Sequence, residues 1–124
     1  FTASSGNAFK LALYTSSASI GAGTTAYSST NEITNTSGSA YTAGGAALTS
    51  VTPVLDSSTA VCDFANISFS SASFTANGCL IYNDTNADRA VCTIAFGGDK
   101  VVTNGTFTIE FPAADASNAI LRIA

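Results

Sequence analysis

Short runs in which apolar and polar residues alternate constrain this chain most strongly. In TFTIEF, at residues 106–111, Phe, Ile and Phe alternate with Thr, Thr and Glu. In FKLALY, at residues 9–14, Phe and two Leu recur at every second position. Because successive side chains of a β-strand point to opposite faces of the sheet, this period predicts strands that bury one face.

The chain as a whole predicts one all-β domain. Turn-forming sequences separate the alternating runs, at LDSST, TANG, NDTNAD, GGDK and TNGT. Short strands at this spacing are typical of an antiparallel β-sandwich, Ig-like or jelly-roll-like, with about seven to eight strands and one long loop. We expect a single domain over residues 1–124, long enough to bury about two thirds of its unfolded surface. The predicted strands span residues 9–14, 46–55, 59–64, 78–82, 90–96, 106–111 and 119–123.

The composition supports strands and argues against several partners. Ser, Thr, Asn and Gly supply most polar positions, and the short polar side chains among them compete for backbone hydrogen bonds and so disfavour helices. Only 10% of the residues are charged and the net charge is −4, so nucleic acid and anionic lipid are not expected partners. No apolar run approaches the roughly 20 residues that a membrane helix needs, so we expect no membrane association.

One segment, residues 16–45, lacks strand periodicity and is rich in Ser, Thr, Gly and Asn. Loops of this length inside a compact domain are usually functional, in part disordered, or ordered by a partner. We predict that three of its apolar residues, Ile20, Tyr27 and Ile33, contact a partner. The alternative is that they pack against their own domain, a role that suits Tyr41 better than Ile20.

The residues that usually carry catalysis are missing from this sequence. The chain has no His, which excludes Ser-His-Asp and Cys-His arrangements and removes the commonest general base. It contains no P-loop, GxSxG or GxGxxG sequence. We therefore predict no enzymatic activity, no catalytic residues and no cofactor.

The sequence NDTNADR contains one candidate pattern for a metal site. Asp84, Asn86 and Asp88 are spaced so that every second side chain can offer an oxygen atom to Ca²⁺. However, Arg89 stands where such loops have Gly, and no Glu follows at the far end. We favour the alternative, a polar turn between two strands that binds no metal.

The chain has three cysteines, so at least one of them is unpaired within the chain. If the strands around NDTNAD pair symmetrically, with Tyr82 opposite Arg89, then Cys79 falls opposite Cys92 and a cross-strand disulfide fits. The alternative, which we favour, is that all three are reduced and pack as small apolar side chains. Cys62 is unpaired in either case.

Three segments, taken together, resemble a family of small virion proteins of tailed bacteriophages. The distinctive phrases are ALYTSSA and YTAGG in residues 9–51, LIYN in residues 63–83, and NGTFTIEFPAADASNAILRIA in residues 95–124. The resemblance implies a particle component without enzymatic activity. It also implies a turn at YTAGG, where Gly44 and Gly45 supply backbone freedom, and a strand at NGTFTIEFP that Pro112 ends.

The resemblance leaves two roles open. The first is a capsid decoration or cement protein that bridges shell subunits, with the major capsid protein or other virion proteins as partners, a homo-oligomeric state on the particle, and assembly in the cytoplasm of the bacterial host. The second is a tail or fibre component that contacts the host surface and binds glycans, which requires aromatic and amide side chains to converge in one groove. A secreted β-sandwich with oxidised Cys79 and Cys92 is a third reading.

Overall fold

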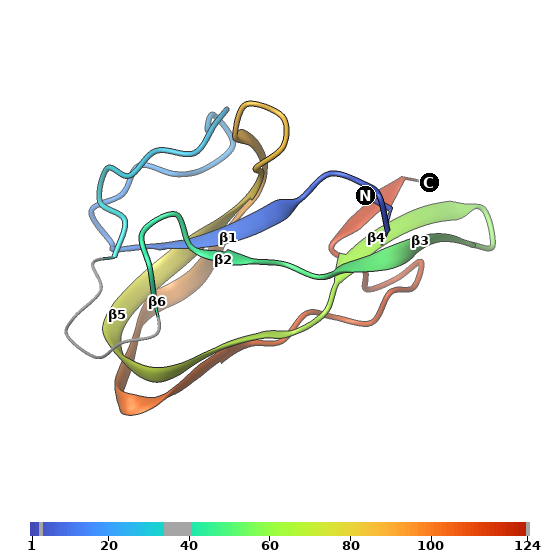
Figure 1. The fold of residues 1–124 in the computed structure, drawn as a ribbon. Helices are drawn as coiled ribbons and strands as arrows, with labels where there is room; N and C mark the ends of the chain where they lie inside the picture. The colour runs from blue at the N-terminus through green and yellow to red at the C-terminus, as the bar shows by residue number, and fades with distance from the viewer. Residues whose placement is uncertain (3, 34–40, 124) are drawn as a thin grey trace.

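The computed structural model describes residues 1–2, 4–33 and 41–123, and this part of the chain forms β-strands and no helix. The strands are β1 (Phe9–Tyr14), β2 (Ala46–Ala47), β3 (Ser50–Asp56), β4 (Thr59–Phe64), β5 (Ile67–Asn83), β6 (Arg89–Ile109) and β7 (Leu121–Ile123). They make two antiparallel sheets, a large one in the order β2-β1-β5-β6 and a small one in the order β3-β4-β7 (Figure 1). The predicted all-β, sandwich-like fold is confirmed.

β5 and β6 form one long hairpin that bends back on itself (Figure 1). At the bend, Ala76 pairs with Lys100 and Gly78 pairs with Ala95, so a single residue of β5 lies opposite four residues of β6. An excess of residues on one strand curves a ladder sharply. Gly97 and Gly98 take positive φ angles of 78° and 151° at this corner, which glycine adopts without steric cost. The bend wraps the hairpin around its own apolar side chains.

The bend also explains which strand predictions were wrong. The sequences TANG, GGDK and TNGT were predicted as turns between strands, but they lie inside β5 and β6. The separate strands predicted at residues 78–82 and 90–96 are parts of these two long strands, and the strand predicted at residues 106–111 is the end of β6 only as far as Ile109. Turn-type residues here make bulges and not chain reversals, because the ladder continues on both sides of each irregularity.

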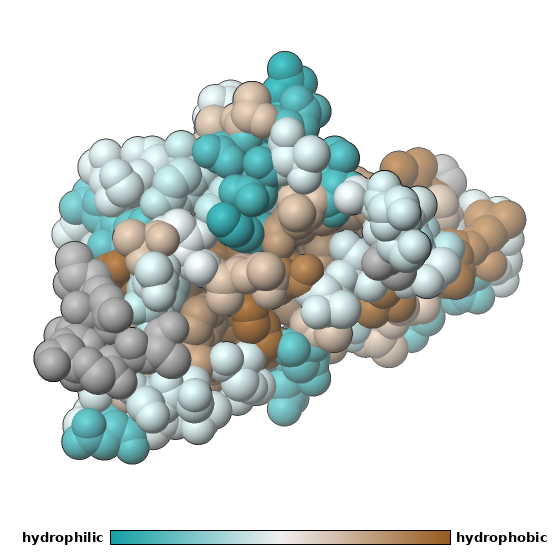
Figure 2. Space-filling view, in the orientation of Figure 1, coloured by the Kyte–Doolittle hydropathy of each residue, from teal (hydrophilic) through white to brown (hydrophobic). Residues whose placement is uncertain are grey.

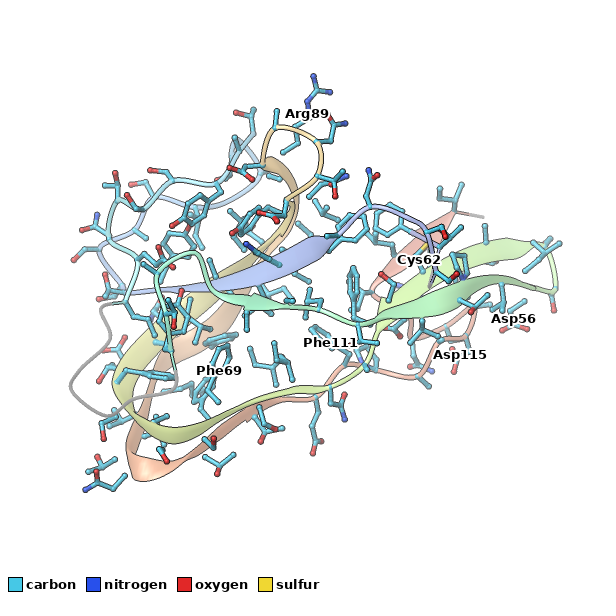
Figure 3. All side chains as sticks on the ribbon, in the orientation of Figure 1. Asp56, Cys62, Phe69, Arg89, Phe111 and Asp115 are labelled. Atoms are coloured by element: carbon cyan, nitrogen blue, oxygen red, sulfur yellow. The ribbon has the colours of Figure 1, made fainter. Side chains whose placement is uncertain are left out.

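The main core lies inside the bend. The ring of Phe74 is 5.1 Å from that of Phe107, and the ring of Tyr41 is 5.5 Å from that of Phe69. Figure 3 shows Phe69 near the bend and Phe111 toward the small sheet. The fully or nearly fully buried members of this core are Phe9, Leu11, Leu13, Ile33, Tyr41, Phe64, Phe69, Ala72, Phe74, Ala76, Cys79 and Ile81.

β1 is buried on both faces, although its alternation predicted one buried face. Leu11 and Leu13 face the main core, whereas Ala12 and Tyr14 belong to a second cluster with Leu80 and Tyr82. Side chains of the segment after β1 cover this second cluster: Ala18, Ile20 and Tyr27. The long loop predicted at residues 16–45 is therefore, in its described part, a layer that covers the outer face of the large sheet. Residues 34–40 of that prediction lie outside the described residues.

The predicted register of the β5–β6 hairpin, which placed Cys79 opposite Cys92, is wrong. Cys79 lies opposite Ile94, and Cys92 lies opposite Ile81. One extra residue, Val91, enters β6 between the pairs on either side of it, so the two strands are not related symmetrically by their turn. All three thiols are free in the structure, and burial raises the pKa of the Cys79 thiol to about 12.

Two further boundaries differ from prediction. The strand predicted at residues 46–55 is divided into β2 and β3, because the chain passes from one sheet to the other: Leu48 N–H donates to Phe9 of β1, and the carbonyl of Thr49 accepts from Ala65, which follows β4. The strand predicted at residues 119–123 begins only at Leu121. The strands predicted at residues 9–14 and 59–64 are confirmed with the same bounds.

Candidate functional site

The four tyrosines of this chain lie around the buried Glu32: Tyr14, Tyr27 and Tyr82 pack on the outer face of the large sheet, and Tyr41 packs in the main core. Tyr27 donates a hydrogen bond to Oε1 of Glu32 at 2.6 Å, and Tyr41 donates to Oε2. The backbone N–H of Gly44 donates to the same Oε2 at 2.8 Å. The carboxylate thus joins three donors that come from distant points of the loop.

The remaining tyrosines extend this arrangement. Tyr82 donates to the carbonyl oxygen of Gly44 at 2.6 Å, and its ring stacks on that of Tyr27 at 4.8 Å. Tyr14 donates to the carbonyl oxygen of Ser28 at 2.7 Å. Every contact joins the loop to a strand or one part of the loop to another, so the Glu32 cluster anchors the loop.

Stability at alkaline pH follows from this cluster. Burial, assisted for Tyr14 by the negative charge of Glu32 and for Tyr82 by that of Asp84, raises the pKa of Tyr14 and of Tyr82 to about 12. Burial and the hydrogen bond to Glu32 also raise the pKa values of Tyr27 and Tyr41. The pKa of an unfolded tyrosine is about 10, so the folded chain retains protons that the unfolded chain releases.

We therefore expect tyrosine ionisation to leave the free energy of unfolding unchanged below pH about 9. We expect this free energy to fall as the pH rises from about 10 toward 12. Urea titrations across this range measure the fall, and tyrosinate absorbance of the folded chain gives the ionisation directly. Tyrosines that ionise near pH 10 while the chain stays folded contradict this expectation.

The three predicted partner-contact residues all pack against the chain itself. Ile33 is only 4% exposed and lies in the main core. Ile20 and Tyr27 are partly buried and cover the second cluster. Isolated apolar residues in a polar loop therefore identified the side chains that attach the loop to its own domain. That Ile20 and Tyr27 also contact a partner stays a prediction.

The candidate calcium residues lie at the turn between β5 and β6. The carboxylate of Asp84 forms an ion pair with Nζ of Lys10 at 3.2 Å. The backbone N–H of Asn86 donates to Oδ1 of Asn83, and the carbonyl of Asp88 accepts from Tyr27 N–H. These contacts make a polar turn that also fastens the loop. Across the described ranges, no three His, Cys, Asp or Glu side chains come together as a metal site.

Asp63 on β4 is, with Glu32, one of two buried acidic residues in the described chain. Its Oδ1 accepts the N–H of Phe64 at 2.8 Å, and its Oδ2 has no hydrogen-bond partner. Two positioned groups are usually needed for acid–base chemistry, and Asp63 has no second titratable group bonded to it. We assign it no catalytic role.

A hollow of about 540 Å³ lies within the loop, where Ser and Thr hydroxyls are frequent. Its lining residues are Tyr14, Ser19, Ile20, Gly21, Gly23, Thr24, Thr25, Ala26, Ser28, Thr30 and Asn31. A glycan site needs an accessible aromatic face beside its polar groups. Tyr14, the aromatic residue of this lining, is only 1% exposed, so the hollow lacks such a face.

The small sheet carries an uncovered row of apolar side chains. Leu55 pairs with Ala60, and Ala60 pairs with Ile123, so these three side chains lie side by side on one face. Leu55 is 71% exposed and Ile123 is 76% exposed. Figure 2 shows apolar atoms at this end of the molecule, over the small sheet. We call these three residues the apolar row.

The other face of the small sheet is only partly covered, since Val54, which pairs with Val61, is 46% exposed. Val61 on that face is 1% exposed. The segment before β7 closes over it: Ala116 N–H donates to Oδ2 of Asp56 at 2.7 Å, and Arg122 donates to the carbonyl of Ser117. Apolar side chains are therefore exposed on both faces of the small sheet.

A second apolar surface is a groove of about 790 Å³ beside β6. It runs from the first half of β6, past the second half, to the segment that precedes β7. Its lining residues are Cys92, Thr93, Ile94, Phe96, Lys100, Phe107, Thr108, Ile109, Glu110, Phe111, Pro112, Asn118, Ala119 and Ile120. The main core is therefore incompletely closed on the β6 side. The sequence analysis missed this groove, because alternation shows which side chains face inward and not whether another strand covers them.

The fold is that of an all-β, sandwich-like protein, with exposed apolar side chains on its small sheet and an apolar groove beside β6. Comparisons with protein-family models, with curated proteins and with solved structures found no match. The described chain contains no helix able to span a membrane.

Proposed function

We propose that this chain is a structural component of a bacteriophage particle, of the capsid decoration or cement type, and that it has no enzymatic activity. The distinctive phrases shared with small virion proteins support the particle role. The apolar row is the structural observation that carries the proposal, since Leu55 and Ile123 expose more than two thirds of their surface at one end of the molecule.

The apolar row suits a shell protein as its partner. The apolar row contains no charge, so its burial against another protein costs no desolvation of ions. A decoration protein needs one such surface on the shell and a stable body behind it. The Glu32 cluster and the layer of loop over the large sheet supply that stability at the other end of the molecule.

The test uses purified particles and the isolated chain. Quantitative mass spectrometry gives the copy number relative to the major shell protein, and we expect the same order of abundance. A few copies per particle would move the chain to the tail or a fibre, and absence from particles would overturn the virion role altogether.

Binding to particles that lack the chain tests the apolar row itself. We expect Leu55→Lys and Ile123→Lys each to weaken binding at least about tenfold, because each places a charge in a desolvated contact. Val101→Lys is the matched control, since Val101 is also 71% exposed but lies on β6. Equal losses in Leu55→Lys and Val101→Lys would contradict the assignment of the shell contact to the apolar row.

A further inference from the structure

The groove beside β6 opens between the two halves of that strand. β6 is the outermost strand of the large sheet, and it bends at Gly97 and Gly98 (Figure 1). Its first half, residues 89–96, and its second half, residues 99–109, both line the groove. The rings of Phe96 and Phe107, one from each half, are 6.2 Å apart. The groove is thus an opening in the side of the fold that leads to the main core.

The groove has the size and the lining of a small-molecule site. Its volume of about 790 Å³ lies within the range of such sites, roughly 300–1,000 Å³. Apolar side chains that pack against the main core line it and are only partly buried: Ile94, Phe96, Phe107, Ile109, Phe111 and Ile120. Apolar surface of this kind favours a ligand that is itself mostly apolar.

Lys100 places a positive charge at one end of this apolar groove. It pairs with the fully buried Ala76, and residues directly opposite each other share a face of the sheet. The Lys100 side chain therefore leaves β6 on the core face, and it lines the groove. The neighbouring Asp99 is engaged elsewhere, since its Oδ1 accepts a hydrogen bond from Nδ2 of Asn77 at 3.0 Å. In the part of the chain that the structure describes, Lys100 has no carboxylate partner.

The other end of the groove carries the opposite charge. Glu110 is exposed and lines the groove directly after Ile109, which pairs with Ile67 near the start of β5. Lys100 pairs much further along β5, so the two charged ends lie more than about 20 Å apart at roughly 3.3 Å per residue. One acyl chain spans about half of the roughly 30 Å hydrocarbon core of a bilayer, so it fits between them. An anionic group is attracted to the Lys100 end and repelled from the Glu110 end.

We infer that the groove binds one free long-chain fatty acid, with the acyl chain between the two halves of β6 and the carboxylate at Lys100. The acyl chain covers apolar side chains that water otherwise contacts, and the ammonium of Lys100 donates to the carboxylate. A peptide strand suits this site less well, because an inward-pointing charge such as Lys100 keeps other strands off an edge. The net charge of −4 disfavours an anionic membrane surface, but a single molecule needs only the local cation.

Fluorescence of cis-parinaric acid, a fatty acid that becomes brighter in apolar surroundings, tests the inference on the isolated chain. We expect saturable binding and displacement by palmitate. Hexadecanol has the same chain length without the carboxylate, so we expect it to bind about fivefold more weakly than palmitate. Equal displacement by the acid and the alcohol would overturn the assignment of the carboxylate to Lys100.

Lys100→Gln tests the charged end of the groove. Because it removes the ammonium group, we expect it to weaken palmitate binding about fivefold and to leave hexadecanol binding unchanged. Lys10→Gln is the matched control, since Lys10 is the other lysine of the chain, lies on β1 and pairs with Asp84. Equal effects of the two substitutions on palmitate binding would contradict the inference.

Cys92 reports where the fatty acid binds. It lines the groove and is partly buried, whereas Cys62 is partly buried on β4 and is not among the groove's lining residues. We expect saturating palmitate to slow the alkylation of Cys92 by N-ethylmaleimide severalfold and to leave that of Cys62 unchanged, as measured by mass spectrometry of the peptides. Protection of both thiols alike, or of neither, would place the ligand elsewhere and overturn the inference.

Two further outcomes would also overturn it. The first is a wild type that binds no palmitate below the concentration at which palmitate forms micelles. The second is a chain that sediments with phospholipid vesicles but binds no free palmitate, which would indicate a membrane surface as the ligand. The result does not depend on the particle role, because the groove and the apolar row share no residue.

Discussion

Glu32→Ala is expected to lower the free energy of unfolding by about 3–5 kcal/mol, because it leaves one buried donor, the Tyr41 hydroxyl, and two partly buried donors without their acceptor. Glu32 is 8% exposed and accepts hydrogen bonds from the Tyr27 and Tyr41 hydroxyls and from Gly44 N–H. Water cannot replace the carboxylate without opening the loop. Urea unfolding followed by tyrosine fluorescence measures the loss, since the chain has no Trp.

Glu32→Gln is the matched control for this prediction. The amide keeps the size of the side chain and one accepting oxygen, so we expect a smaller loss of about 1–3 kcal/mol. Tyr27→Phe removes one donor and leaves the acceptor in use, and its loss is expected to be smaller still. If Glu32→Ala unfolds within 1 kcal/mol of the wild type, the cluster does not hold the loop against the sheet.

Gly45→Ala is expected to cost about 4 kcal/mol or more, a large share of the roughly 5–15 kcal/mol by which ordinary domains are stable. A Cβ atom at Gly45 would lie 1.9 Å from the carbonyl oxygen and 2.6 Å from the carbonyl carbon of Leu11. Both atoms belong to the backbone of β1, in the middle of the large sheet, so no side chain can move aside. The residue also has φ +84, which Ala adopts only with strain. Circular dichroism and the yield of folded chain measure the effect.

A substitution at the neighbouring Gly44 distinguishes the effect of the steric clash from that of the backbone strain. Gly44 has φ +93, yet its added Cβ would meet only the Tyr82 hydroxyl, at 3.7 Å. Gly44→Ala is therefore expected to lose only about 1–2 kcal/mol from its left-handed backbone. Equal losses at both positions would show that the close approach of Gly45 to β1 does not decide stability.

These two predictions concern the same feature, the closure of the loop over β1. Glu32 binds the loop through side chains, and Gly45 lets the chain pass the β1 backbone at close range. The YTAGG phrase contains both Tyr41, which donates to Glu32, and Gly45. Its two glycines do supply backbone freedom, as the sequence predicted, and both have positive φ angles. The sequence did not show that only Gly45 also requires the absence of a side chain.

Local sequence patterns were enough to predict the fold class and the bounds of two strands. The all-β class follows from alternating runs and from the scarcity of helix-forming residues, and β1 and β4 have their predicted bounds. These predictions succeeded because period and propensity act within a few residues. The sequence also contains an uncharged run at residues 90–98, which lies in β6.

Only the tertiary structure decided the rest, because it depends on which strands pair and in which register. Because of the bend at Gly97 and Gly98, sequences predicted as turns lie inside β5 and β6. One extra residue in β6, Val91, shifts the register so that Cys79 and Cys92 do not lie opposite each other. Ile20 and Tyr27, the loop residues predicted to contact a partner, cover a sheet face beside Glu32. Contacts of this kind join residues far apart in the chain, so their energies appear only once the strands are placed.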